Sequence, residues 1–189
     1  NVYVCAINGN FDDAQTGVKT IFTNDDIKTI LSENNMEFSS ANSINWGRLA
    51  PQIIYYISSY CDLMDKGEDY LKDGFNVVVP TGNFGNILAA YYARQMGAPI
   101  AKLICASNSN NVLSDFLKTG TYNRNRDFYT TISPSMDILI SSNLERMLYE
   151  LTGHNDNQVA AWQDALKNEG KYTVSEDVLA KLKDIFYGG

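Results

Sequence analysis

The sequence predicts an α/β fold with a mainly parallel sheet flanked by helices. Short apolar segments typical of strands alternate with longer segments whose apolar residues have helical spacing. One short segment, residues 74–80, contains the run Val77-Val78-Val79, which is typical of a strand buried on both faces of a parallel sheet. The chain has 189 residues, 44% of them hydrophobic and 20% charged, which is enough for a domain with a buried core.

The beginning of the chain predicts two strands and two helices. Residues 2–7 are β-compatible and stop at a Gly-Asn pair, as a strand would. Residues 12–22 place their apolar side chains on one helical face. A second short helix is expected after Asn24 or Asp25, either of which would cap it. Residues 36–40 are a second candidate strand.

The middle of the chain predicts a helix, then a strand that leads into another helix. Residues 49–60 have helical spacing, and Pro51 would have to lie in the first turn, where its missing N–H is tolerated. The strand at 74–80 runs through a glycine-containing loop, residues 81–86, into a helix over 87–96. This strand–loop–helix order is a unit of a parallel sheet.

The end of the chain adds more elements of both kinds. They are a strand over 101–106 and helices over 111–117, 144–151 and 178–186. The last two helices follow Ser142-x-x-Glu145 and Thr173-x-x-Glu176, each of which has the pattern of a capping box.

The charge balance and the hydropathy pattern exclude two classes of partner. Fifteen Lys and Arg against 22 Asp and Glu give a net charge of −7, the opposite of the balance that phosphate neutralisation requires, so nucleic acid is not expected. No apolar run approaches the roughly 20 residues that span a bilayer, so no membrane partner is expected. The chain does not begin with Met and starts directly in a strand-like segment, which suggests a piece of something longer.

The cysteines and the single histidine offer no metal site. Cys5, Cys61 and Cys105 are widely separated, and His154 lies in a polar stretch expected at the surface. A zinc site or a disulfide framework would want clustered cysteines. We expect Cys5 and Cys105 to be buried thiols in apolar strands, and a reducing cytoplasm to be the natural compartment.

The segment from Val77 to Met96 is the strongest candidate site. Ligands of parallel α/β sheets bind beyond the carboxyl ends of the strands, where helix N-termini present unpaired N–H groups and a positive dipole end. Gly82 and Gly85 would let the loop turn tightly and approach a phosphate, and Asn83 and Asn86 add neutral donors. The loop has no Lys, so it is not a Walker A loop, and a simple glycine turn remains the alternative.

Two other polar segments could contribute chemistry. Residues 40–48 gather hydroxyls, amides and Arg48 in one short turn, and Arg suits bidentate contact with a phosphate or carboxylate. The alternative is a capped helix start with a surface Arg. Asp137 could be an acid or an anchor, although a turn with a solvated Asp would look the same in the sequence.

Five segments, taken together and in this order, resemble threonine synthase and extend over about three quarters of the chain. They are Gly9-Asn10-Phe11-Asp12-Asp13-Ala14-Gln15, Ala41-Asn42-Ser43-Ile44-Asn45-Trp46-Gly47-Arg48, Val79-Pro80-Thr81-Gly82-Asn83-Phe84-Gly85-Asn86, Ser133-Pro134-Ser135-Met136-Asp137-Ile138 and Ser141-Ser142-Asn143-Leu144-Glu145-Arg146. The family consists of pyridoxal-phosphate enzymes of the tryptophan-synthase-β-like fold type (fold type II). They convert O-phosphohomoserine and water into threonine and phosphate, as carbon–oxygen lyases of threonine biosynthesis.

The resemblance implies roles for two groups of residues. The group implied to hold the cofactor phosphate is Gly82, Asn83, Phe84, Gly85 and Asn86. The group implied to face the substrate phosphate is Asn42, Ser43 and Arg48. No residue of this chain matches the family's catalytic lysine, whose His-Gly-Pro-Thr-x-x-Phe-Lys-Asp type of segment is absent, as are its Ser-Gly-Asp-Thr-Gly and Asp-Pro-His-Thr-Ala segments.

These departures predict an interior fragment of threonine synthase with a truncated fold. Residues 1–40 would be the end of the small domain and residues 41–189 part of the large α/β domain. Without the Schiff-base lysine we expect the isolated chain to be inactive and to hold no covalent cofactor. The exposed sheet edge and apolar face of such a fragment would favour self-association. The alternatives are a threonine-synthase-like phospholyase and a non-enzymatic phosphoanion-binding or interaction domain.

Overall fold

The computed structural model describes residues 2–67, 71 and 73–189. Contacts within the chain divide it into two units, Asn1–Ala41 and Asn42–Gly189. Whether they correspond to the small and large domains of a longer enzyme stays a prediction.

Two capped helices make up most of the first unit. Helix α1 spans Phe11–Thr23, and its cap Asn10 forms a capping box with Asp13: the Asn10 side chain accepts from the Asp13 N–H at 3.1 Å, and the Asp13 carboxylate accepts from the Asn10 N–H at 2.9 Å. Helix α2 spans Asp25–Glu33, and the Asn24 side chain caps it by accepting from the Ile27 N–H. Both predicted helices are confirmed.

The two strands predicted in this unit are wrong. Residues 2–7 and 36–40 are irregular, because a strand needs a neighbour to pair its backbone and the described part of this unit contains none. Phe38 instead stacks its ring on Phe22 of α1, with centroids 4.6 Å apart. None of the described residues 2–41 is buried, and Cys5, expected inside a strand, is exposed.

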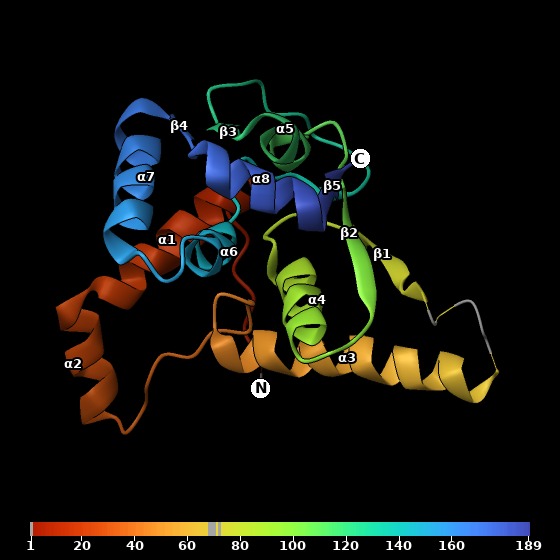
Figure 1. Ribbon diagram of the computed structural model, residues 1–189. Helices are drawn as coiled ribbons and strands as arrows, with labels where there is room; N and C mark the ends of the chain where they lie inside the picture. The colour runs from red at the N-terminus through yellow and green to blue at the C-terminus, as the bar shows by residue number, and fades with distance from the viewer. Residues whose placement is uncertain (1, 68–70, 72) are drawn as a thin grey trace. The chain divides into compact units, whose positions relative to one another are not determined.

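A three-stranded parallel sheet forms the centre of the second unit (Figure 1). Its strands are β1 (Phe75–Pro80), β2 (Ile100–Ala106) and β5 (Phe186–Gly188), in the order β1-β2-β5. Two strands that were not predicted, β3 (Thr121–Asn123) and β4 (Lys171–Thr173), pair in an antiparallel ribbon. The predicted α/β class and its parallel sheet are confirmed.

Helices connect these strands and form the core with them. They are α3 (Trp46–Asp65), α4 (Gly85–Gln95), α5 (Val112–Thr119), the short 3₁₀ helix η2 (Pro134–Met136), α6 (Leu144–Leu151), α7 (Asp156–Glu169) and α8 (Glu176–Ile185). Helix α4 is buried almost throughout and packs against α3, its neighbour in Figure 1. Helix α7 was not predicted, because its apolar side chains are few and only Leu166 is buried.

Helix α6 spans the residues predicted for it, but its predicted cap is wrong, as are the first turn predicted for α3 and the start and cap predicted for α8. Helix α3 begins at Trp46 with Asn45 as its cap, so Pro51 lies inside the helix rather than in its first turn. Helices α6 and α8 begin after Asn143 and Ser175, with no capping hydrogen bond from either side chain. The residues predicted as their caps have other places: Thr173 belongs to β4, and Ser142 precedes the true cap of α6.

Among the described residues, other elements cover only one face of the sheet. The prediction that β1 is buried on both faces is therefore wrong. Val79 is 4% exposed and packs in the core with Leu103, the buried Cys105 and Phe186, whereas Val78 is 61% exposed. Val78 pairs in register with Ile104, and Ile104 with Tyr187, which is 63% exposed, so the three side chains share the open face. No described helix is both long enough and apolar enough to cross a membrane.

Candidate anion-binding site

The loop after β1 is fixed at both ends before helix α4 begins. The Thr81 N–H donates to the Ala106 carbonyl at 2.9 Å, and the Thr81 hydroxyl donates to the Val79 carbonyl at 2.7 Å. At the other end Phe84 caps α4 in the left-handed conformation, φ 62°, with its ring 1% exposed and packed against Phe186. A left-handed residue before a helix helps successive N–H groups to point toward one side.

The backbone of this loop presents donors without acceptors. Within the described residues, none of the six N–H groups of residues 82–87 donates a hydrogen bond. The carbonyls are satisfied: Gly82 accepts from the Ser141 hydroxyl at 2.9 Å, Asn83 from the Asn143 N–H, and Phe84 from the Leu88 N–H. Together with the positive end of the α4 dipole, this arrangement favours an anion.

A cavity of about 230 Å³ opens beside the loop. Its lining comes from the end of β1, the loop, the first turn of α4, Ser43, Gln52, Ser135 and Met136. The two glycines provide space here, and neither has a positive φ. A Cβ on Gly85 would overlap the Ser43 hydroxyl, and a Cβ on Gly82 would lie 3.3 Å from the Ser135 carbonyl oxygen. Glycine is therefore required by close approach.

The two asparagines of the loop differ in what their side chains do. The Asn86 amide is held by helix α3: its oxygen accepts from the Tyr56 hydroxyl at 2.6 Å, and its nitrogen donates to Gln52 at 2.9 Å. Burial raises the pKa of Tyr56 to about 12, so this hydroxyl keeps its proton and stays a donor. The Asn83 side chain is half-buried and accepts from Ser142 at 3.4 Å. Asn86 thus offers the cavity its backbone N–H and not its amide.

The predicted substrate-phosphate residues lie next to this loop to different degrees. Ser43 is half-buried and lines the cavity. Asn42 folds its side chain back to accept from the Ile44 N–H at 3.0 Å, which shapes the turn. Arg48 lies in the first turn of α3, exposed. Among the described residues that line the cavity, Ser43 is present and Asn42 and Arg48 are not.

Asp137 is an internal anchor, which excludes the solvated turn that the sequence left open. It is 4% exposed, and its carboxylate accepts from the Thr131 N–H and hydroxyl and from the side chains of Asn108 and Asn110. These hydrogen bonds, with that of the Thr131 backbone the largest influence, hold the pKa of Asp137 below its ordinary value. The anchor fixes the segment that carries Ser135 to the cavity.

Sequence reasoning missed two residues behind the cavity. Both lie at the start of α6. Asn143 donates to Ser43 and to the Asn83 carbonyl of the loop after β1. Arg146 donates to the Ser43 carbonyl and to the Asn143 side chain. They were seen only as part of a motif and of a supposed capping box. Their partners lie 60 to 103 residues away in sequence, so no local pattern could have identified them.

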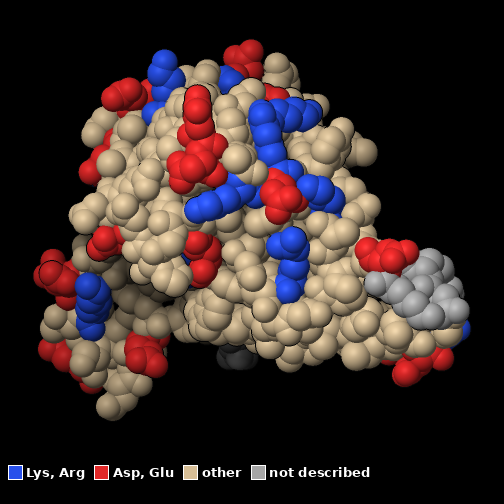
Figure 2. All heavy atoms as spheres, viewed as in Figure 1, with Lys and Arg blue, Asp and Glu red and all other residues tan. Residues whose placement is uncertain are grey.

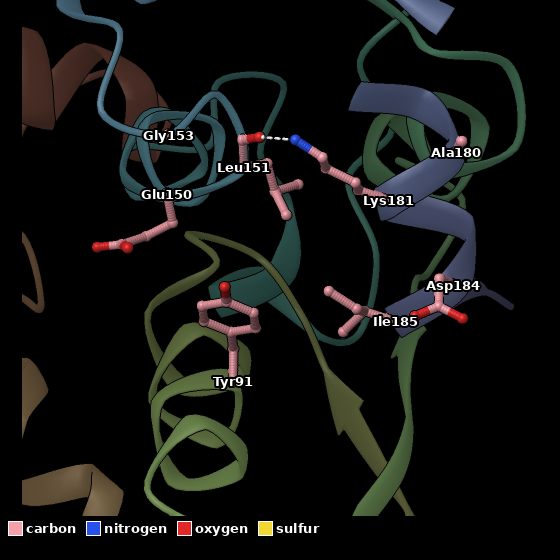
Figure 3. Close-up of a pocket in the computed structure, with 8 residues that line it drawn as sticks. All are labelled: Tyr91, Glu150, Leu151, Gly153, Ala180, Lys181, Asp184 and Ile185. Atoms are coloured by element: carbon pink, nitrogen blue, oxygen red, sulfur yellow. Dashed lines mark hydrogen bonds between the residues drawn. The ribbon is translucent and has the colours of Figure 1, made fainter. Parts of the chain in front are cut away.

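A larger cavity elsewhere does not have the chemistry of an anion site. About 540 Å³ lies between α4, the end of α6 and α8, with Glu150 and Asp184 in its lining (Figure 3). Lys181, the cation there, donates to the Leu151 carbonyl at 2.8 Å. On the face shown in Figure 2, basic and acidic residues are interspersed, which fits the net charge of −7. The described residues hold no cluster of three His, Cys, Asp or Glu able to bind a metal.

Comparison with known proteins tests the resemblance that the five sequence segments indicated. No family model matches the chain. Human threonine synthase-like 1 is 44% identical over 188 residues, which cover 98% of the chain and 25% of that protein. Threonine synthase of Saccharomyces cerevisiae is 42% identical over 188 residues, covering 95% of the chain and 35% of that protein.

Solved structures give the same result. The crystal structure of PLP-bound threonine synthase from Brucella melitensis superposes with a TM-score of 0.80 at 42% identity, over 97% of the chain and 37% of that structure. The chain is similar to one part of a threonine synthase. The yeast threonine synthase structure agrees, with a TM-score of 0.75 at 37% identity. The resemblance drawn from the five segments is confirmed, and the chain spans a quarter to about a third of these relatives' length.

Proposed function

We propose that the chain is a part of a pyridoxal-phosphate-dependent threonine synthase that makes threonine and phosphate from O-phosphohomoserine and water. The observation that carries this proposal is the row of six N–H groups without acceptors at the start of α4, next to the Ser43 turn. The names of the relatives, and the PLP bound to the Brucella melitensis enzyme, support the choice of cofactor and reaction.

The loop fits the phosphate of pyridoxal phosphate. A phosphate monoester carries close to two negative charges and accepts several hydrogen bonds, which is what Gly82, Asn83, Phe84, Gly85 and Asn86 offer through their backbone. No carboxylate is among the residues that line the cavity within the described part of the chain, so nothing there repels an anion at short range. When bound, the cofactor supplies an electron sink for the carbanion chemistry of its substrate.

The turn that carries Asn42 and Ser43, with Arg48 one helical turn later, is assigned to the substrate phosphate. The Ser43 hydroxyl already lies at the cavity, and the Arg48 guanidinium has the planar fork that suits phosphate oxygens. In this assignment the residues of this chain bind and orient the two phosphates. The Schiff-base amine has no match in the sequence, so the isolated chain is expected to be inactive and to hold no covalent cofactor.

Phosphate titration of the 189-residue chain tests the loop. Amide chemical shifts should move at residues 82–87 when inorganic phosphate is added, with a dissociation constant on the order of millimolar, about 4 kcal/mol for a few backbone hydrogen bonds. Gly85→Ala should abolish these shifts, because its Cβ overlaps Ser43 and so forces the backbone of the loop itself to move at residue 85. Gly17→Ala, where a Cβ meets nothing within 4 Å, is the matched control. Shifts that cluster elsewhere, or survive in Gly85→Ala, would refute the site.

Borohydride reduction tests the expected lack of a covalent cofactor. After incubation with pyridoxal phosphate, the chain should show only scattered lysine labelling in peptide maps. One lysine modified to stoichiometry, together with turnover of O-phosphohomoserine, would show that the chain is itself an enzyme.

The alternative enzyme function is that of a threonine-synthase-like phospholyase; the human relative is named threonine synthase-like 1. Such a phospholyase would eliminate phosphate from a related amino-alcohol phosphate. The full-length protein that contains this chain separates the candidates: turnover of O-phosphohomoserine supports a synthase, turnover of phosphoethanolamine supports a phospholyase, and binding of phosphate without turnover of either supports a binding domain. The free cysteines fit the proposed reducing cytoplasm.

A further inference from the structure

Asn143 connects the two segments that the proposed function assigns to phosphates. It is fully buried at 0% exposure, and its backbone N–H donates to the Asn83 carbonyl at 3.1 Å. Its side-chain nitrogen donates to the same carbonyl at 2.9 Å and to the Ser43 hydroxyl at 3.1 Å. One side chain therefore holds the phosphate loop and the Ser43 turn together, and its oxygen accepts from Arg146 instead of capping α6.

Arg146 completes this connection from the next turn of α6. Its guanidinium donates to the Ser43 carbonyl at 3.1 Å, to the Ile44 carbonyl at 2.5 Å and to the Asn143 side-chain oxygen at 2.5 Å. A planar guanidinium binds several acceptors in fixed directions, which a lysine cannot do. The Arg146 guanidinium thus spans the Ser43 turn and Asn143 with one rigid group.

We infer that Asn143 and Arg146 are positioning residues that hold the Ser43 turn in one register with the phosphate loop. This inference rests on the proposed function. It goes further because it couples the two anion sites: a phosphate bound at residues 82–87 also orders the turn, through the Asn83 carbonyl, Asn143 and the Ser43 hydroxyl. The two phosphates of cofactor and substrate are then held at a set distance from each other, which selects substrates whose phosphate lies at that distance from the reacting carbon.

Inorganic phosphate and the 189-residue chain provide the test. In the wild type, amides 43–45 should respond to phosphate together with amides 82–87 and with the same midpoint. Arg146→Lys keeps the charge and loses the fork, so amides 82–87 should keep a midpoint within about threefold of wild type while amides 43–45 lose most of their shift. Arg124→Lys is the matched control, because the Arg124 guanidinium also donates to a backbone carbonyl, that of Lys167, and neither residue lines this cavity.

Ser43→Ala provides a milder second variant if Arg146→Lys fails to fold, which circular dichroism would show. It removes only the hydroxyl that accepts from Asn143, and it too should uncouple amides 44–45 from the loop. A turn that still responds with the loop in these variants would overturn the inference, and so would a wild-type loop that responds alone. Phosphate that moves no amide of residues 82–87 would instead refute the phosphate loop of the proposed function.

Discussion

The Asp137 carboxylate is a single ionisable group that holds several loop residues in place. Four hydrogen bonds converge on its carboxylate from residues 108, 110 and 131. All four favour the ionised form, which is why the pKa of Asp137 lies below its ordinary value. Its folded pKa is depressed, so its stabilisation is present above the unfolded pKa of about 3.9 and is lost as the pH falls through the lower folded pKa.

The prediction at this residue concerns Asp137→Asn. The amide keeps the shape but replaces an acceptor oxygen with a donor, so the variant should be less stable at pH 7 and should lose less stability than the wild type between pH 4 and pH 2. Urea unfolding at several pH values measures both effects. Asp127→Asn, an exposed neighbour, is the control. Wild-type and Asp137→Asn curves that run parallel down to pH 2 would contradict this account.

The glycine loop could be predicted from the sequence because its physics is local. A strand, two glycines and a helix start are visible in residues 77–96 without knowledge of anything else. The structure adds a reason for the glycines that the sequence did not show, which is the close approach of Ser43 and Ser135, while the positive φ of the loop falls on Phe84. Those approaching residues come from distant segments, and the sequence contains no measure of the distance between them.

Helix caps show the same division at the scale of elements. Asn24 caps α2 as expected, and Asn10, which was not predicted as a cap, caps α1; the partners of both lie within three residues. Asn143 does not cap α6, because its side-chain oxygen accepts from the Arg146 guanidinium while its nitrogen donates to Asn83 and Ser43. Strands β3 and β4 have three residues each, too few for alternation to be recognised.

The β3–β4 ribbon is joined to the α6 region through one hydroxyl, and this gives the prediction for an element. Tyr122 is 1% exposed; its hydroxyl donates to the Leu139 carbonyl at 2.9 Å and accepts from the Ser141 N–H at 2.9 Å. Tyr122→Phe removes the acceptor of the buried Ser141 N–H, so the free energy of unfolding should fall by about 1–3 kcal/mol.

Thermal or urea unfolding measures that loss. Tyr187→Phe, at a residue 63% exposed on β5, should change stability by less than about 0.5 kcal/mol and serves as the control. Equal effects of the two substitutions would show that the hydroxyl of Tyr122 does not link the ribbon to the α6 region.

At the scale of the whole molecule, the open face of the sheet decides how copies of the chain behave. Val78, Ile104 and Tyr187 form an apolar row without cover from the described residues. Apolar surface of this kind favours association, while a net charge of −7 opposes it at low ionic strength. We therefore propose that the isolated chain self-associates through this face, more strongly as salt screens the charge.

Light scattering over a range of concentration and salt tests this proposal. Val78→Lys should shift the species toward monomer, because it places a charge at the most exposed aliphatic residue of the row, on the edge strand β1. Val18→Lys, which changes a half-exposed apolar residue of α1, controls for the added charge. A wild-type chain that stays monomeric at high concentration in high salt would contradict the proposal.

The phosphate loop, residues 82–87, offers its ligand peptide N–H groups, and this cradle of N–H groups has a consequence for the pH dependence of binding. Peptide N–H groups do not titrate, so the cradle has the same strength in weak acid as in weak base. Any change of phosphate affinity with pH then belongs to the guest, which gains its second charge near a pKa of about 6. Protonation of the protein therefore does not weaken such a site, and the site distinguishes ligands by their charge.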